Sequence, residues 1–126
     1  MTVNKKRPVN LDLLTIKQPV TAISSILHRI TGVVLFLSIP LILWGLSQTL
    51  SSAETYSALQ DQLTTNSGKF IVWAILSSLS YHVVAGFRHL VMDLGIGETF
   101  DTAKTTSTIT ILVGISAAVF WGTWLW

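Results

Sequence analysis

Three long stretches of the chain carry no Asp, Glu, Lys or Arg. They cover residues 30–53, 70–87 and 105–126, which are 24, 18 and 22 residues long. Because an α-helix rises about 1.5 Å per residue, about 20 apolar residues cross the roughly 30 Å hydrocarbon core of a bilayer. Each stretch is long enough to span a membrane, and this interpretation is favoured over three apolar helices in a soluble bundle.

The pattern predicts an all-α membrane protein with three transmembrane helices and a short cytoplasmic N-terminal arm. The chain is expected to form a single domain over residues 1–126. The helices are expected at about 20–50, 69–95 and 104–126, with a polar loop over residues 51–68 between the first two.

The composition supports lipid as the solvent. The chain has 126 residues, is 50% apolar and has only 11% charged residues, whereas soluble domains have about 25%. It has no cysteine, which excludes disulfides, zinc–thiolate sites and iron–sulfur ligation by this chain. A net charge of +2 without a basic stripe gives no indication of a nucleic-acid partner. No cleaved signal is expected, because the basic cluster near the start is followed by polar residues.

Basic residues collect on one side of the predicted membrane. The side that carries the N-terminus has Lys5, Lys6, Arg7, Lys17, Arg88 and Lys104. The loop on the other side has only Lys69. Since cytoplasmic loops carry an excess of Lys and Arg, the N-terminus is predicted to be cytoplasmic and the C-terminus to lie on the opposite side.

Polar residues form a stripe early in the first helix. Ser25, His28, Arg29 and Gly32 are three and four residues apart and therefore share a face. A charged side chain in a membrane costs about 2.5–3.5 kcal/mol on insertion scales, so it normally faces protein, water or a cofactor. The stripe suits an anionic or carbonyl-bearing ligand. The alternative is that Arg29 only extends to the lipid headgroups.

A second polar face lies in the second half of the second helix. It comprises Ser78, His82, Ala85, Gly86 and His89. Small residues on either side of His82 would leave space for a porphyrin beside an imidazole that binds its iron. The alternative is a histidine that only packs and forms hydrogen bonds.

Spacing limits which histidines can share one iron. His82 and His89 are two turns apart, about 10.5 Å along the helix axis. Two imidazoles on opposite faces of one metal have nitrogens about 4 Å apart, given metal–nitrogen bonds near 2.0 Å. The second ligand of a six-coordinate haem would therefore be His28 or a residue of another chain.

Carboxylates follow at the predicted cytoplasmic end of the second helix. Asp93, Glu98 and Asp101 lie in or beside the turn over residues 95–106. They are either candidates for carrying protons between water and a buried site or ordinary solvated acids of a turn.

Residues 7–13, 25–32 and 82–93 together resemble the cytochrome b membrane-anchor subunit of bacterial succinate dehydrogenase, the succinate:ubiquinone oxidoreductase of respiratory complex II. The paired motifs are Ser-x-x-His-Arg in the second stretch and His-x-x-x-Gly-x-Arg-His in the third. The resemblance covers nearly the whole chain, and Phe87 is a departure from the aliphatic residue usual in the family.

The resemblance implies a haem and a quinone site. His82 would be the axial ligand to the iron of a haem b, with the other ligand a histidine of a second membrane-anchor subunit. His28, Arg29 and His89 would lie near the haem propionates. Ser25 and Arg29 would line the ubiquinone pocket, and this chain would catalyse nothing by itself.

The resemblance also implies partners, a location and a proton path. The partners would be the second membrane-anchor subunit, the iron–sulfur subunit, the flavoprotein subunit and the lipid bilayer of the bacterial inner membrane. Asp93 and Glu98 would be proton-path candidates, and the arm at Arg7 and Pro8 would lie against the iron–sulfur subunit. A haem-free anchor, a fumarate-reductase-type anchor and an unrelated channel or transporter are the alternatives.

Overall fold

The computed structural model describes residues 17–126, and these residues form four α-helices and no strand. The helices are α1 (Val20–Ser51), α2 (Ala53–Thr64), α3 (Asn66–Asp93) and α4 (Phe100–Leu125). The predicted all-α class is confirmed. The basic cluster at Lys5, Lys6 and Arg7 and the N-terminal arm lie outside the described residues.

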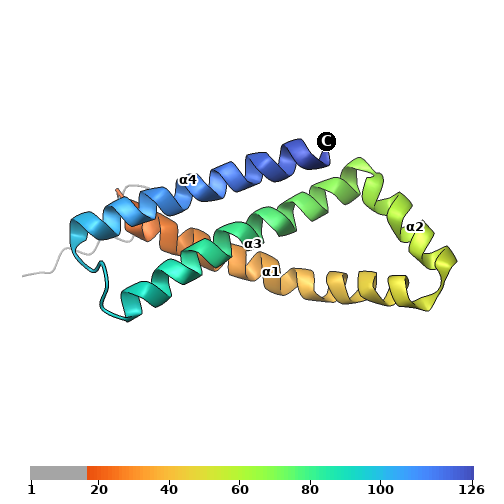
Figure 1. Ribbon diagram of the computed structural model, residues 1–126, viewed down its shortest axis with the longest axis horizontal. Coiled ribbons are helices and arrows are strands. Elements are labelled where there is room, and N and C mark those ends of the chain that lie inside the picture. The colour runs from red at the N-terminus through yellow and green to blue at the C-terminus, as the bar shows by residue number, and fades with distance from the viewer. Residues whose placement is uncertain (1–16) are drawn as a thin grey trace, which may run out of the picture.

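The two longest helices, α1 and α3, cross each other, and α4 runs beside α3 (Figure 1). On one side of the crossing α1 and α3 diverge, and α2 joins their separated ends. Helix α3 contacts each of the other three helices. Helix α1 does so as well, so the crossing of α1 and α3 is the centre of the fold.

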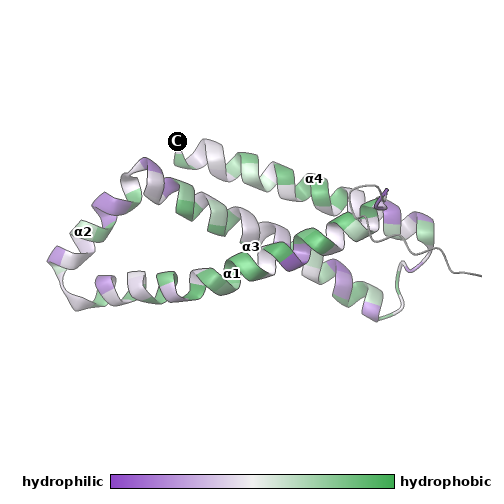
Figure 2. Cartoon of the chain, turned by 180° about the vertical axis from the view of Figure 1, so that it is seen from behind, coloured by the Kyte–Doolittle hydropathy of each residue, from purple (hydrophilic) through white to green (hydrophobic). Residues whose placement is uncertain are grey.

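The distribution of side chains is that of a protein dissolved in lipid. Large apolar side chains are exposed along the outer faces, for example Phe36 (69%), Leu37 (68%) and Phe87 (69%). Green apolar colour accordingly covers much of α1, α3 and α4 in Figure 2. The buried side chains are small or polar, apart from Tyr81: Ser24, Ser38, Ala85, Ala103, Ser107 and Thr110. Membrane helices associate through small residues and hydrogen bonds, because lipid is as apolar as leucine.

Three of the four helices, α1, α3 and α4, are long and apolar enough to cross a membrane. This agrees with the predicted number of spans, and the chain is a multi-pass membrane protein. Helices α3 and α4 each begin three or four residues earlier than expected. The connection between them turns at Gly95 and Gly97, both with φ of +77°, a conformation that glycine adopts without steric cost.

The prediction of a loop over residues 51–68 was wrong, because most of this segment is helix α2. A reciprocal capping box starts the helix: Ser52 Oγ accepts from the Thr55 amide, and Thr55 Oγ1 accepts from the Ser52 amide, both at 3.1 Å. Glu54 in the first turn is favourable beside the positive end of the helix dipole. The loop was predicted because residues 51–68 are mostly polar. However, the segment also contains Ala, Glu, Leu and Gln, which are good helix formers.

Candidate functional site

Three imidazoles meet where α1 crosses α3. The His28 ring from α1 lies between the His82 and His89 rings from α3, and all three are half-buried. The centroids of His28 and His82 are 4.1 Å apart with 16° between the planes, and those of His28 and His89 are 5.0 Å apart with 25°. The structure thus brings together the three histidines that the sequence singled out on two separate helices.

Glycines on each helix receive the imidazole of the other. A Cβ atom on Gly32 of α1 would lie 3.0 Å from His82 Cε1, and one on Gly86 of α3 would lie 3.4 Å from His28 Nε2. The sequence expectation was that small residues beside His82 leave room for a flat ligand. At Gly86 that space is filled by the His28 ring, so any ligand of His82 has to approach from another side.

Hydrogen bonds fix which nitrogen of His82 is free. Its Nδ1 lies 3.1 Å from the His28 carbonyl oxygen and 3.2 Å from Thr31 Oγ1. A carbonyl only accepts, so Nδ1 carries the proton and Nε2 keeps its lone pair. Nε2 makes no hydrogen bond to residues 17–126. A metal-binding histidine is held in this way, with one ring N–H donated to a carbonyl and the other nitrogen available.

The other two imidazoles differ in how their nitrogens are satisfied. His89 Nδ1 donates to the Ala85 carbonyl at 2.6 Å, within the same helix. His28 Nε2 is buried and has no partner among the described residues. A buried polar atom without a partner costs about 1–3 kcal/mol, and Ser77 Oγ and Ser107 Oγ are in the same position.

The stacking also bears on which residue can be a second iron ligand. The ligand lone pair of an imidazole lies in the ring plane, whereas His28 and His82 face each other ring to ring. Their nitrogens therefore do not converge on one point between them. Of the two sources that the sequence left open, this geometry favours another chain over His28. Residues 17–126 contain no group of three or more His, Asp or Glu side chains placed to hold a metal ion, and a haem iron needs only one ligand from this chain.

The predicted stripe on α1 is divided between two faces. His28 and Gly32 face α3, whereas Arg29 is exposed and Ser25 is half-buried. One residue along a helix is a rotation of about 100°, which turns Arg29 away from its neighbour His28. Ser25 and Arg29 thus lie at the edge of the histidine cluster and not inside it.

A serine–tyrosine contact beside the histidines was missed from the sequence. The Tyr81 hydroxyl donates to the Ser24 carbonyl at 3.0 Å and lies 3.1 Å from Ser24 Oγ. Tyr81 also packs on Gly114 of α4, so this one side chain joins three helices. The available signal was the spacing of hydroxyls at Ser24, Thr31 and Ser38, which places all three on one helix face.

Arg88 is a second contact that sequence reasoning used only for orientation. Its Nε donates to Thr106 Oγ1 at 3.0 Å, and its Nη2 donates to the Ala103 carbonyl at 3.1 Å. Both partners belong to α4. A cation near the end of a membrane helix is thereby satisfied by a neighbouring helix, and α4 is tied to the histidine end of α3.

The acids at this end are exposed to water. Asp93 is the last residue of α3, and Glu98 lies in the turn that follows. Both line a cavity of about 450 Å³, together with Arg88 and His89. Asp101 is exposed in the first turn of α4 and does not line that cavity.

Comparison with known proteins identifies the family. A family model described as the succinate dehydrogenase/fumarate reductase transmembrane subunit matches residues 3–122. The succinate dehydrogenase cytochrome b556 subunit of Coxiella burnetii is 42% identical over 125 residues, which cover 98% of this chain and 100% of that protein. The same subunit of Paracoccus denitrificans is 33% identical, over 90% of this chain and 87% of its own length. The cytochrome b560 subunit of Reclinomonas americana is 36% identical, over 86% and 79% respectively. The chain therefore belongs to the family of succinate dehydrogenase/fumarate reductase transmembrane subunits.

Proposed function

We propose that this chain is the haem b- and ubiquinone-binding membrane anchor of a succinate dehydrogenase. It would help to pass electrons from the iron–sulfur subunit to ubiquinone, in the respiratory chain and the tricarboxylic acid cycle. The observation that carries the proposal is the orientation of His82, whose Nδ1 is held by the His28 carbonyl while Nε2 stays available. The names of the relatives, cytochrome b556 and b560 subunits, point to the same group.

His82 is the residue that would bind the haem iron, through Nε2. The backbone carbonyl and Thr31 hold its ring in one orientation, which raises the basicity of the ligating nitrogen. The unpaired His28 Nε2 supports a role for His28 toward a haem propionate, and His89 and Arg29 are proposed for the same carboxylates. A second membrane-anchor subunit would supply the other axial ligand. When bound, the haem supplies a centre that can hold one electron.

Ser25 and Arg29 are proposed to line the ubiquinone site. A hydroxyl and a guanidinium both donate hydrogen bonds, and ubiquinone presents two carbonyl oxygens that gain negative charge on reduction. Charge-assisted hydrogen bonds in a water-poor pocket stabilise such charge. The proximity of both residues to the histidine cluster along α1 supports this assignment.

Asp93 and Glu98 are proposed to supply protons at the same end of the molecule. Both side chains are exposed, and both border the cavity that His89 also lines. A carboxylate at the water boundary takes up and releases protons as reduction to quinol consumes them.

The partners follow from the same proposal. The chain would assemble with a second membrane anchor, the iron–sulfur subunit and the flavoprotein subunit, in the bacterial inner membrane with its N-terminus in the cytoplasm. The succinate-oxidising site would lie in the soluble subunits, so this chain alone would not be an enzyme.

Optical spectra of the assembled enzyme test the haem assignment. We expect His82→Ala to abolish most of the reduced-minus-oxidised b-type band and to lower haem per flavin at least fivefold, because no other imidazole nitrogen is oriented to replace Nε2. Val83→Ala is the matched control and should keep the band, since Val83 adjoins His82 on α3 but its side chain is exposed on the outer face. An unchanged band in assembled His82→Ala enzyme would refute ligation and favour a haem-free anchor.

A further inference from the structure

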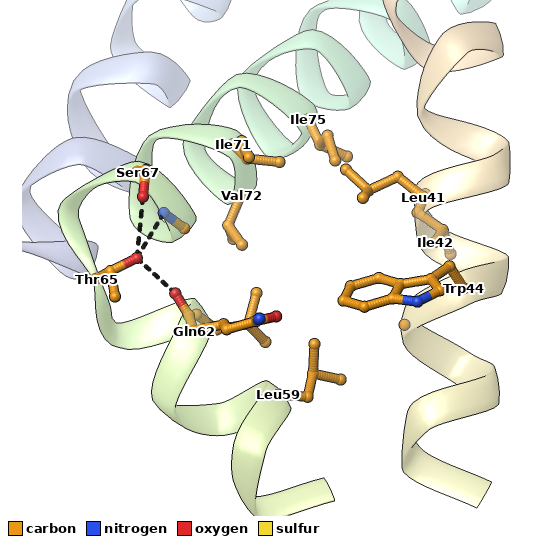
Figure 3. Close-up of a pocket in the computed structure, with 13 residues that line it drawn as sticks. Leu41, Ile42, Trp44, Leu59, Gln62, Thr65, Ser67, Ile71, Val72 and Ile75 are labelled. Carbon is orange, nitrogen blue, oxygen red and sulfur yellow. Dashed lines mark hydrogen bonds between the residues drawn. The ribbon is translucent and has the colours of Figure 1, made fainter. Parts of the chain in front are cut away.

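An apolar cavity lies at the other end of the molecule from the histidines. It fills the space where α1 and α3 diverge and α2 joins them, and its volume is about 490 Å³ (Figure 3). Pockets of about 300–1,000 Å³ are typical of ligand sites. On α1 the lining begins 13 residues beyond His28, which places it about 20 Å further along the helix.

Polarity changes along this cavity in one direction. Its walls are mostly apolar, with Leu41, Ile42 and the Trp44 indole on α1 and Ile71, Val72 and Ile75 on α3. Apart from the indole N–H of Trp44, the polar lining gathers at the corner between α2 and α3, where Gln62, Thr65 and Ser67 lie. The occupant therefore has an apolar part in the depth and a polar part at the corner.

The polar corner retains hydrogen-bonding capacity and a nearby positive charge. Thr65 Oγ1 is used in the helix cap, since it donates to the Gln62 carbonyl at 2.6 Å and accepts from the Gly68 amide at 3.1 Å. The Gln62 side-chain amide makes no hydrogen bond within residues 17–126 and is exposed. Lys69 follows Gly68 in the sequence and is half-buried, although it is not among the residues that line the cavity. Amide and ammonium groups complement a phosphate and its ester oxygens.

The dimensions and the polarity of the lining argue against two other occupants. Along α3 the cavity runs from Ser67 to Ile75, about 12 Å, whereas a helix that crosses the bilayer needs about 30 Å. Helix α2 also closes the end of the cavity, so a spanning helix could not continue through it. A quinone ring carries carbonyl groups on opposite sides, whereas the polar lining gathers at one corner apart from the Trp44 indole N–H, which favours an occupant with a single polar end.

We propose that this cavity binds one acyl chain of a phospholipid from the leaflet opposite the histidine cluster. The chain would lie between Leu41, Val72 and Ile75, and the headgroup phosphate would be at the corner of Gln62 and Lys69. This site does not depend on haem or ubiquinone binding by the chain. The bound lipid would fill the space that α1 and α3 leave open, and so would stabilise this end of the bundle.

Native mass spectrometry of the detergent-purified complex tests the proposal. We expect the wild-type complex to retain one more phospholipid per copy of this chain than the variant Val72→Trp, whose larger side chain fills the cavity. Val113→Trp is the matched control, because Val113 is exposed on α4 and lines none of the cavities described here. It should retain the wild-type number.

A second measurement keeps the test decisive where Val72→Trp lowers the yield. After delipidation, added dioleoyl phosphatidylglycerol should raise the melting temperature of the wild type, and the smaller filling change Ile75→Phe should reduce that rise by more than half. Equal lipid retention in wild type and Val72→Trp, or retention of a quinone in place of the lipid, would overturn the proposal. The number of retained lipids is measured independently of the b-type band. The lipid proposal can therefore fail while the haem assignment holds, and the reverse is also true.

Discussion

The two ends of the α1–α3 pair are built in opposite ways. At the crossing, glycines face imidazoles so closely that a Cβ on Gly32 would lie 3.0 Å from His82, and the interior holds serines and a tyrosine. At the α2 end, the same two helices present isoleucine, leucine and tryptophan to each other and leave a cavity of about 490 Å³. The end with more polar side chains is the one that packs more tightly.

The reason for the difference lies in the solvent. In lipid, an apolar side chain gains little by leaving acyl chains for another apolar side chain, so nothing forces the α2 end to close. A polar group has no partner in acyl chains, so polar groups at the crossing gain by reaching across the helix interface, as His82 does to the His28 carbonyl and Tyr81 does to Ser24. Tight packing in this protein therefore follows hydrogen-bonding need, and glycines allow the close approach that those hydrogen bonds require.

Among changes that test this difference in packing, Gly114→Ala is expected to lower the free energy of unfolding the most. The added methyl group would clash with the Tyr81 ring, which is 7% exposed and held by its hydrogen bond to Ser24. Overpacking costs about 1–3 kcal/mol, from which the roughly 1 kcal/mol that alanine gains over glycine in a helix is subtracted. We expect a net loss of up to about 2 kcal/mol, measured by thermal unfolding of the purified complex.

The matched control for that change is Gly122→Ala on the same helix. Its Cβ would lie 3.6 Å from Trp73 Nε1, an ordinary contact, so its stability should stay within about 0.5 kcal/mol of wild type. If Gly114→Ala is as stable as Gly122→Ala, the Tyr81 ring can move to make room for the methyl group, and its contact with Gly114 is not tightly packed.

An intermediate effect is expected from Arg29→Leu, which tests the proposed quinone site. Loss of a charge-assisted hydrogen bond is worth about 1.5–3 kcal/mol, so quinone reduction by the assembled enzyme should fall about tenfold or more. Dye-linked succinate oxidation should stay within about twofold, because it bypasses the quinone. Lys69→Leu removes a cation at the other end and should leave both rates unchanged, whereas equal loss of both rates in Arg29→Leu would indicate failed assembly.

The smallest effect is expected from Gly45→Ala at the α2 end. The nearest atom to the added methyl group would be Leu59 Cδ2 at 4.0 Å, so there is room for it. Alanine should therefore keep or raise the free energy of unfolding, by up to about 1 kcal/mol. A loss of more than about 0.5 kcal/mol would show that this end is packed as tightly as the crossing.

Much of the fold could be predicted from the sequence, because the membrane imposes a simple rule on it. The three stretches without charge correspond to α1, α3 and α4, and the helix class follows from the need to satisfy the backbone inside lipid. Helix α2 could not be predicted by that rule, since it is polar and its formation depends on the cap at Ser52 and Thr55.

The site was only partly predictable, for a geometric reason. Unusual residue types in an apolar helix mark His28, Arg29 and His82 without any knowledge of the fold. Which of them face the next helix depends on rotation about the axis, and this rotation turns Arg29 outward and Ser24 inward. The contacts of Tyr81 and Arg88 join different helices and lie 57 and 18 residues apart in the chain, so no spacing within one helix indicates them.

Helix α2 has a consequence for how this anchor can vary. Its 12 residues measure about 18 Å from end to end, and extended residues at Ser52 and Thr65 bound it on both sides. It therefore acts as a spacer whose length sets the separation of the two helix ends that it joins. Inserting or deleting a turn there would widen or narrow the lipid-facing end and leave the imidazole stack in its present register. The two ends can thus change independently during evolution or in protein engineering.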